Sequence, residues 1–315
     1  MDKNLKEFIL KSTNSYSIKD ISIIDSVWGG YGDISRVTLD DKVVIIKRIN
    51  LINGQKKHPK GWNSIESHQR KVQSYIVEIN WYKHYSSNFY NLKTPKYISS
   101  LITKNEIIVI LEDMMQSNFS KVSKPSLKQI KLCINWIAKL HAQTLLTEKK
   151  YLWPIGSYWQ LETRKNEFLN MTDNLLKDNA VKIHKKMQDA KFHSTIHGDS
   201  KPSNYLFNEN EVVAVDFQYA GSGIGPKDLV TLLSSSFDND ELYRNEKECI
   251  NYYFLCLTNF IIKYQKNIKA TDVEKEWREL LDYAFCDYYR FLDGWSPNDQ
   301  RLNEFAKSKI QKRLD

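Results

Sequence analysis

The chain has 315 residues, of which 41% are hydrophobic and 12% aromatic, with only 11 glycines and 7 prolines. This composition excludes a disordered, collagen-like or low-complexity protein and predicts a compact fold of one large or two ordinary domains. The net charge of +8 comes from the first 104 residues, which carry 17 Lys and Arg against 9 Asp and Glu. We therefore expect this first third to attract a polyanion, either a nucleotide triphosphate or a nucleic acid.

The first part of the chain predicts a small, mostly β region with one long helix. Predicted elements, in chain order, are a short helix over 3–11, β-runs at 21–28, 34–39 and 42–49, a helix over 64–85, and β-runs at 96–103 and 106–111. A glycine-containing turn and an Asp-Asp turn separate the first three runs, which indicates successive antiparallel strands.

Beyond residue 113 the pattern becomes helical. Helices are predicted near 126–146, 162–175, 178–191, 240–266 and 272–293, with short β-runs at 205–207 and 212–217. The sequence thus predicts an α+β fold of two lobes, a β-rich N-lobe over residues 1–113 and a larger, mainly helical C-lobe over residues 114–315.

Cysteine usage and the first residues indicate the compartment. No CxxC pair or zinc-like spacing occurs among Cys133, Cys249, Cys256 and Cys286, so reduced core residues are expected. The first ten residues, MDKNLKEFIL, are charged where a secretory signal would be apolar. We expect a cytoplasmic protein that does not span a membrane.

The segment TIHGDSKPSNYLF, residues 195–207, carries the most informative polar groups and is followed by VAVDFQ. Asn204 lies on a loop that enters a short strand, and Asp216 lies at the end of the returning strand, so a hairpin would bring the two together. Carboxylate and amide oxygens form a site suited to Mg²⁺. Asp199, five residues before Asn204, is free to face an acceptor hydroxyl.

A lysine inside a buried strand is the second feature. The run VVIIKRI places Lys47 among apolar residues, and burying an ammonium group is costly unless an anion meets it. An edge-strand lysine would be the simpler alternative.

These motifs resemble the catalytic loop and metal-binding segment of the protein-kinase-like superfamily, in the HGDxxxxN form of aminoglycoside phosphotransferases, choline kinases and ecdysteroid-kinase-like proteins. The resemblance spans most of the chain. It implies that Asp199 orients the acceptor hydroxyl and takes its proton, that Asn204 and Asp216 hold Mg²⁺, and that Lys201 lies near the transferred phosphoryl group. His197 is expected mainly to brace the loop.

The same resemblance assigns nucleotide contacts in the first lobe. Lys47 would contact the α- and β-phosphates of ATP and pair with Glu78 of the predicted helix. The WGGYGD turn would cover the phosphates through Gly29, Gly30 and Gly32, whose missing side chains let backbone N–H groups approach.

A hinge between the lobes is expected in the segment IVILEDM, which resembles the LEDL segment of these phosphotransferases. Main-chain groups from Glu112 to Met114 would bind adenine there. The alternative is a strand end with a solvated acidic pair.

After the metal-binding aspartate the sequence departs from protein kinases. It reads DFQ rather than DFG, only eleven residues separate Asp216 from Asp228, and no APE follows, so there is no room for a long activation loop. The DFQ…GxGPxDL pattern is most similar to the small-molecule branch that contains ecdysteroid-kinase-like and choline-kinase-like enzymes. A protein substrate is disfavoured, and Asp228 is expected to brace the catalytic loop.

Three segments could bind the acceptor, and each has a simpler interpretation. The aromatic and acidic residues over 277–295 could cage a quaternary ammonium or bind an aminoglycoside, but their helical spacing favours core packing. The aromatic segment 153–159 is either a pocket wall or a packed connector. The basic loop 53–70 is expected to be solvated, with a lid or a contact for an acidic partner as the alternative.

The function predicted from the sequence is transfer of the ATP γ-phosphoryl group, with Mg²⁺, to a hydroxyl of a small molecule that is choline-like, aminoglycoside-like or another alcohol. A catalytically silent nucleotide-binding regulator of the same fold is the alternative. A nucleic-acid-binding protein that uses the basic first lobe is less favoured, because ATP attraction also explains that charge.

Overall fold

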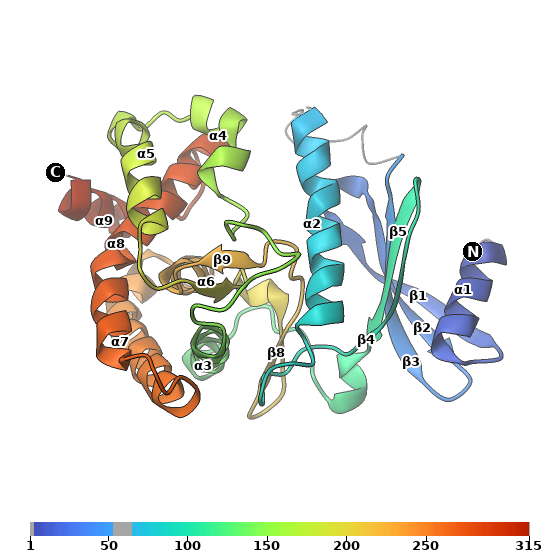
Figure 1. Cartoon of the computed structure of the whole chain (residues 1–315). Coiled ribbons are helices and arrows are strands. Elements are labelled where there is room, and N and C mark those ends of the chain that lie inside the picture. Colours follow the sequence, from blue (N-terminus) through green and yellow to red (C-terminus); the bar gives the residue numbers. More distant parts are fainter. Residues whose placement is uncertain (1–2, 53–64, 315) are drawn as a thin grey trace. The chain divides into compact units, whose positions relative to one another are not determined.

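The structure, a computed structural model, describes residues 3–52 and 65–314. The chain divides into two compact units, Met1–Asn88 with Lys93–Ser120, and Phe89–Leu92 with Lys121–Asp315. The first unit contains an antiparallel sheet and the second is mostly helical (Figure 1). The predicted α+β fold class is therefore confirmed.

A five-stranded antiparallel sheet in the order β1-β2-β3-β5-β4 forms the first unit together with its helices. The elements of this unit are α1 (Lys3–Thr13), β1 (Ile18–Val27), η1 (Trp28–Gly30), β2 (Gly32–Leu39), β3 (Val43–Asn50), α2 (Ile65–His84), β4 (Tyr97–Ile102), β5 (Glu106–Glu112) and η3 (Met114–Ser117).

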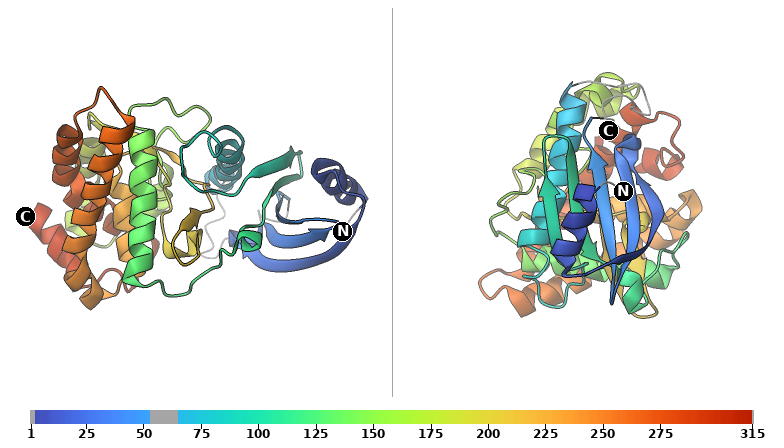
Figure 2. Two further views of the ribbon diagram at one scale, coloured as in Figure 1. Left: turned by 90° about the horizontal axis from the view of Figure 1, so that it is seen from below. Right: turned by 90° about the vertical axis from the view of Figure 1, so that its right-hand side faces the viewer.

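The central strand β3 is buried because helices cover both faces of the sheet. Val44 and Ile46 face a core that includes Leu5 and Ile9 of α1. Side chains alternate along a strand, so Lys47 points to the opposite face, where α2 lies. Figures 1 and 2 show the sheet between α1 and α2.

Helices and two short strand pairs make up the second unit. Its elements are α3 (Leu127–Gln143), η4 (Leu161–Thr163), α4 (Lys165–Leu169), α5 (Asn174–Gln188), β6 (Ser194–Ile196), η5 (Pro202–Asn204), β7 (Tyr205–Phe207), β8 (Val212–Ala214), β9 (Gly221–Gly223), α6 (Pro226–Ser236), α7 (Asn239–Tyr264), α8 (Ala270–Trp295) and α9 (Glu304–Leu314). The strand β6 pairs with β9, and β7 pairs with β8.

Buried ion pairs join α6 to α8 inside this unit. Asp287 of α8 lies 3.2 Å from Lys227 of α6 and 2.6 Å from Arg290. Burial acts to raise the pKa of Asp287, but the two cations outweigh it and lower this pKa to about 2. The Asp287 carboxylate therefore stays charged and fixes α6 against α8.

The predicted helix over 162–175 is wrong. The chain forms η4 and the short helix α4, and α5 begins only at Asn174. The side chain of Asp293 accepts hydrogen bonds from the N–H groups of Thr172 and Asp173, at 2.7 and 2.9 Å, and Asp173 caps α5 through the N–H of Leu176. These anchors interrupt the helical periodicity.

Two other boundaries differ from the sequence predictions. The strand predicted over 212–217 ends at Ala214, so Asp216 lies beyond it. His68 and Arg70, predicted within a basic loop, belong to α2, and residues 53–64 of that loop lie outside the described residues.

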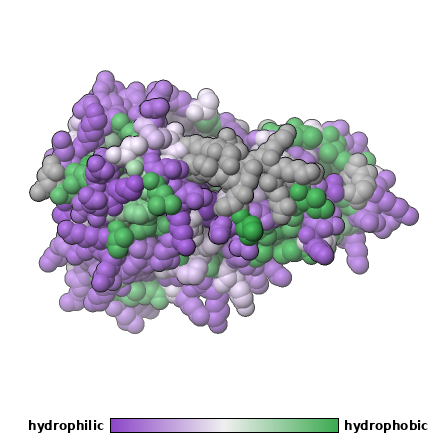
Figure 3. Space-filling view, turned by 90° about the horizontal axis from the view of Figure 1, so that it is seen from above, coloured by the Kyte–Doolittle hydropathy of each residue, from purple (hydrophilic) through white to green (hydrophobic). Residues whose placement is uncertain are grey.

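Among the described residues, no helix is long and apolar enough to cross a membrane. On the face shown in Figure 3, hydrophilic residues cover most of the coloured surface, and hydrophobic residues form scattered patches.

Candidate active site

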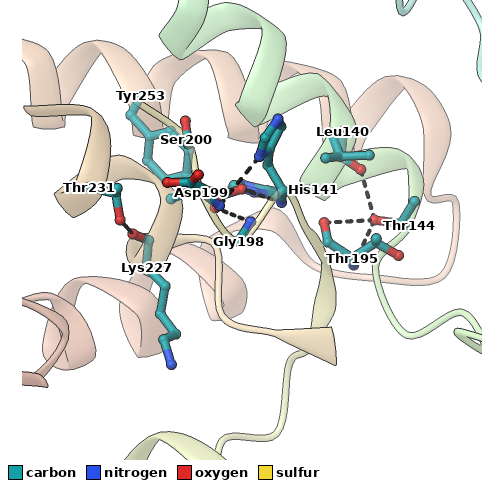
Figure 4. A network of polar contacts seen from close by, with 12 residues as sticks. Leu140, His141, Thr144, Thr195, Gly198, Asp199, Ser200, Lys227, Thr231 and Tyr253 are labelled. Carbon is teal, nitrogen blue, oxygen red and sulfur yellow. Dashed lines mark hydrogen bonds and ion pairs between the residues drawn. The ribbon is translucent and has the colours of Figure 1, made fainter. Parts of the chain in front are cut away.

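The loop after β6 is held by the carboxylate of Asp228, in the first turn of α6. Asp228 accepts hydrogen bonds from the backbone N–H groups of His197 and Gly198, at 2.6 and 2.9 Å, and lies 3.1 Å from Nε2 of His141. Figure 4 shows His141, Gly198 and Asp199 close together in this network. The expectation that Asp228 braces the loop is therefore confirmed.

Asp228 remains charged although it is fully buried. Burial acts to raise the pKa of its carboxyl, but the hydrogen bonds from His141 and Gly198 and the nearby imidazoles outweigh burial and lower this pKa. A charged acceptor makes stronger hydrogen bonds to backbone N–H groups than a neutral one does. The loop is thus fixed by charge-assisted bonds.

Gly198 occupies a position that only glycine fits. Its φ is +79°, and a Cβ atom there would lie 2.1 Å from the carbonyl oxygen of Tyr219. The chain can therefore turn sharply between His197 and Asp199.

His197 holds the loop rather than facing solvent. Its Nε2 lies 3.0 Å from the carbonyl oxygen of Val215, and its Nδ1 accepts the N–H of Asp199 at 3.3 Å. Both ring nitrogens are thus used within the protein, which agrees with the bracing role expected from the sequence.

The two carboxylate oxygens of Asp199 have different surroundings. Oδ2 lies 2.9 Å from Nζ of Lys201 and 3.1 Å from Nδ2 of Asn204. Oδ1 is buried and has no hydrogen-bond partner among the described residues. Since an unsatisfied buried carboxylate oxygen is costly, Oδ1 is poised to accept a proton donor from a bound molecule.

Lys201 is the cationic neighbour of this carboxylate. The Asp199 carboxylate raises the pKa of Lys201 above its usual range, against the opposing effect of burial. The ammonium group is therefore charged at neutral pH. Its side chain is 42% exposed, so it can also reach a bound molecule.

Asn204 and Asp216 are brought together by the β7–β8 hairpin. The N–H of Val215 donates to the carbonyl oxygen of Asn204 at 2.9 Å, which places Asp216 one residue from that contact. The amide nitrogen of Asn204 donates to Asp199, so the amide oxygen is on the opposite side of the planar group.

Asp216 has a left-handed backbone, with φ of +65°. Such strain is costly for a residue other than glycine and is concentrated at functional sites. Its carboxylate also accepts a hydrogen bond from the side chain of Gln218. The Asn204 and Asp216 donors are hard oxygen atoms and fit Mg²⁺. No cluster of three or more His, Cys, Asp or Glu residues suited to a metal occurs in the described residues, so the site would rely on an amide as well.

The segment 153–159 packs directly against the loop after β6. The N–H of Tyr158 donates to the carbonyl oxygen of Gly198 at 3.0 Å, and the N–H of Ser157 to that of Tyr219 at 3.1 Å. The indole N–H of Trp153 donates to the carbonyl oxygen of Gln218 at 2.8 Å. The segment is therefore both a packed connector and a neighbour of the site.

The side chain of Tyr158 lies within electrostatic range of Asp199. Burial, together with Tyr288 and Asp199, raises the pKa of Tyr158 well above its ordinary value. Its ring lies 5.9 Å from that of Tyr219. The sequence identified the segment but not Tyr158 itself, because only tertiary contacts, such as the backbone hydrogen bond from Tyr158 to Gly198, bring this residue close to the loop.

In the first unit, Lys47 and Glu78 form the expected ion pair. Nζ of Lys47 lies 2.7 Å from Oε2 of Glu78, and the two residues are only 6% and 3% exposed. The ammonium group also lies 5.7 Å from the ring centroid of Tyr75. The buried lysine is therefore not an edge-strand surface residue.

Two residues of the glycine turn adopt positive φ, a backbone conformation that favours glycine. Gly29 and Gly30 have φ of +77° and +72°. At Gly32 a Cβ atom would lie 1.9 Å from the carbonyl oxygen of Arg48, so this residue lets β2 pack closely on β3.

The predicted hinge segment begins at the end of β5. The side chain of Glu112 accepts the N–H of Lys96 at 3.1 Å, and Met114 is buried at the start of η3. Asp113 accepts a hydrogen bond from Nε of Arg36 at 2.7 Å. Both residues of the acidic pair, Glu112 and Asp113, therefore make protein contacts, and the pair is not simply solvated.

Five of the seven aromatic residues of α8 lie close to a cation from this chain. The groups lie 3.8–5.9 Å from the ring centroids: Arg313 over Tyr283, Lys309 over Phe285, Arg301 over Tyr288, and Arg164 over Phe291 and Trp295. Trp277 is fully buried and donates its indole N–H to the carbonyl oxygen of Phe192. Most of these rings are thus packed against protein groups, cationic or apolar.

Chains of known structure share this fold. The amicoumacin kinase hAmiN, in complex with AMP-PNP, Ca²⁺ and Ami, is 12% identical, covers 100% of this chain and 97% of its own, and has a TM-score of 0.61. A choline kinase from Cryptosporidium parvum is 11% identical over 99% of this chain and 94% of its own, with a TM-score of 0.55. A microcompartment-associated aminopropanol kinase is 11% identical over 97% and 93%, with a TM-score of 0.53. The chain therefore shares its fold with these three kinases.

The sequence profile of the ecdysteroid kinase-like family matches residues 55–153 and 154–266, more than half of the chain. The chain belongs to the ecdysteroid kinase-like family. No curated protein matches it significantly.

Proposed function

We propose that this protein transfers the γ-phosphoryl group of ATP to a hydroxyl of a small acceptor molecule. The observation that carries the proposal is Oδ1 of Asp199, a buried carboxylate oxygen without a partner in the described part of the chain, on a loop that Asp228 holds rigid. An acceptor hydroxyl that donates a hydrogen bond to Oδ1 would be aligned for attack on the γ-phosphoryl group and could pass its proton to this carboxylate.

Lys201 would assist by position and charge. It keeps Oδ2 of Asp199 occupied, so that Oδ1 is the oxygen left for the acceptor. Its charged ammonium group would also stabilise negative charge on the transferred phosphoryl group.

Asn204 and Asp216 would hold Mg²⁺ through the amide oxygen and the carboxylate. The ion, when bound, neutralises charge on the phosphate oxygens of ATP. The left-handed backbone of Asp216 and its bond from Gln218 set the direction in which its carboxylate points.

Residues 1–113 would supply the nucleotide contacts. Lys47, oriented by Glu78, would bind the α- and β-phosphates, the backbone at Gly29, Gly30 and Gly32 would cover them, and main-chain groups from Glu112 to Met114 would bind adenine. Residues 114–315 would supply the catalytic and acceptor groups.

The acceptor wall proposed here is Tyr158 with Tyr219, because these rings lie beside the catalytic loop. The rings of α8 are unsuited to cage a quaternary ammonium, since cations of this chain already occupy them and would repel another. We therefore favour an acceptor whose bound portion is uncharged over a choline-like one.

The unpaired thiols of the four cysteines agree with a reducing compartment such as the cytoplasm. Cys133, Cys249, Cys256 and Cys286 are all free and buried. Burial raises the pKa of the Cys133 thiol well above its ordinary value, which keeps it unreactive.

Two aspartate variants test the function. Asp199→Ala should leave Mg²⁺·ATP binding measurable and reduce phosphoryl transfer by at least about 10²-fold, because it removes the proton acceptor. Asp216→Ala should weaken Mg²⁺·ATP binding itself. Transfer of radiolabelled γ-phosphate would be measured over a panel of neutral alcohols, sugars, sterol alcohols, aminoglycosides, choline and ethanolamine, with Asp189→Ala on the exposed end of α5 as the control.

Wild-type turnover by Asp199→Ala on an acceptor found in this panel would contradict the proposal. A wild-type protein that binds Mg²⁺·ATP and phosphorylates none of the panel would favour the silent regulator. Salt-dependent oligonucleotide binding without nucleotide binding would favour the nucleic-acid alternative.

A further inference from the structure

The glycine turn of the first unit is tied to α2 by one residue pair. The hydroxyl of Tyr31 lies 2.8 Å from Nδ1 of His68, in the first turn of α2. The two rings are also stacked, with centroids 5.8 Å apart and an interplanar angle of 17°. Tyr31 is 8% exposed, so this contact is largely shielded from water.

The environment of the phenol keeps its hydroxyl available for this hydrogen bond. Burial raises the pKa of Tyr31, against a smaller opposing effect of Arg70. The phenol is therefore protonated at neutral pH, and its O–H is available to bond Nδ1 of His68.

The turn depends on such an anchor because its own backbone is permissive. Gly29 and Gly30 adopt positive φ, and a Cβ atom at Gly30 would meet nothing within 4 Å. Glycine in open space has wide conformational freedom, which must be restricted if the backbone N–H groups are to bind phosphates. Tyr31 follows these two glycines directly and restricts the turn.

The same face of α2 contacts the buried lysine. His68, Tyr75 and Glu78 are separated by seven and then three residues, which places them along one side of a helix. Tyr75 packs against Tyr31 with centroids 6.0 Å apart, and its ring lies 5.7 Å from Nζ of Lys47. A single helix face therefore touches the turn and the ion pair of Lys47.

We propose that Tyr31 and His68 form a clasp that sets the position of the Gly29–Gly30 turn relative to Lys47, so that both are positioning residues for the phosphates of the nucleotide. The inference rests on the proposed function, because it takes the turn and Lys47 to be phosphate contacts. Neither residue needs to touch ATP. The clasp acts by limiting where the turn can go.

A loosened clasp should weaken nucleotide binding selectively, whereas a general loss of stability should not distinguish between ligands. Tyr31→Phe removes the hydroxyl and keeps the ring, and the turn is expected to loosen while Lys47 and Glu78 stay paired. The Kd of Mg²⁺·AMP-PNP should rise about 3- to 10-fold, the range of one lost hydrogen bond, whereas the Kd of adenosine, which has no phosphates, should not change.

Variants of His68 provide a second test of the clasp. His68→Ala should weaken Mg²⁺·AMP-PNP binding as much as Tyr31→Phe does, and the double variant should be no weaker than either single one, since both changes break the same bond. His68→Asn, whose Oδ1 can replace Nδ1 as the acceptor, should recover part of the affinity.

The matched control is Tyr97→Phe. The hydroxyl of Tyr97, in β4 of the same unit, lies 2.8 Å from Oγ of Ser100, so this variant loses an equivalent hydroxyl contact. It should bind Mg²⁺·AMP-PNP with wild-type affinity. Binding would be measured by isothermal titration calorimetry, with melting temperatures to confirm that each variant is folded.

Wild-type affinity for Mg²⁺·AMP-PNP in both folded Tyr31→Phe and folded His68→Ala would overturn the clasp and leave the proposed function intact. Equal losses of adenosine and Mg²⁺·AMP-PNP affinity would also overturn it, because they would indicate a general change in the unit. A wild-type protein that does not bind Mg²⁺·AMP-PNP would overturn the proposed function and the clasp with it.

Discussion

At the scale of residues, the different surroundings of the two Asp199 oxygens make this side chain the centre of the candidate site. One oxygen is held by Lys201 and Asn204, and the other is buried without a partner among the described residues. A side chain restrained on one oxygen can present the other in a single direction, which is the preorganisation that catalysis needs.

Substitution of Lys201 tests whether the restraint of one Asp199 oxygen contributes to catalysis. In Lys201→Met the Asp199 carboxylate keeps Asn204 and loses its cation, so turnover should fall about 10²-fold, while Mg²⁺·AMP-PNP affinity should change little. Steady-state kinetics on an acceptor from the panel would measure the loss. Lys186→Met, on the exposed side of α5, is the control, and equal turnover of both variants would contradict a role for Lys201.

The motif residues of this site could be predicted from the sequence, because spacing within one loop and one hairpin fixes them. Asp199, Lys201, Asn204 and Asp216 all lie within 18 residues of one another. Tyr158 and His141 could not be predicted. They reach the loop from elsewhere in the chain, through contacts that depend on packing and leave no local pattern.

At the scale of elements, α6 supports the loop after β6 through one side chain. Asp228 accepts two backbone N–H groups and contacts His141, and all of these groups are buried. Removal of a buried charge that satisfies several donors leaves them unpaired, which is among the costlier single changes in a protein.

Asp228→Ala should lower the free energy of unfolding by about 3 kcal/mol at pH 7. The folded-state pKa of Asp228 is lowered from its ordinary value of 3.8, so its stabilising effect is complete above that value and is lost as the pH falls below it. The difference between wild type and variant in urea unfolding should therefore shrink from pH 7 to pH 3. A difference that stays constant, or grows, on acidification would contradict this assignment.

The elements themselves differ in how well sequence patterns predict them. The strands of the sheet and the long helices α2, α3, α7 and α8 have clear periodicity, and they form where it predicts. The helix predicted over 162–175 forms only at α4, because Asp293 binds the N–H groups of Thr172 and Asp173. The three-residue strands β6 and β9 are too short for any periodicity to show.

At the scale of the whole molecule, the order of motifs predicts the fold class and the superfamily better than any motif alone. A glycine turn, a buried lysine, a helical glutamate and an HGDxxxxN loop occur in the required sequence order, and the fold and the family match agree with them. The acceptor could not be predicted in the same way. The aromatic residues of α8 suggest a cation cage in sequence, but in three dimensions protein cations lie close to five of their rings.

The central claim is that Mg²⁺ and a nucleoside triphosphate bind together through Asp216, and calorimetric titration with AMP-PNP tests it without knowledge of the acceptor. Asp216→Asn is the variant to use, since asparagine tolerates the left-handed backbone at this position. We predict that wild type binds AMP-PNP tightly only with Mg²⁺, and that folded Asp216→Asn loses most of this Mg²⁺-dependent affinity. Equal affinity of wild type with and without Mg²⁺, or wild-type affinity in Asp216→Asn, would contradict the account.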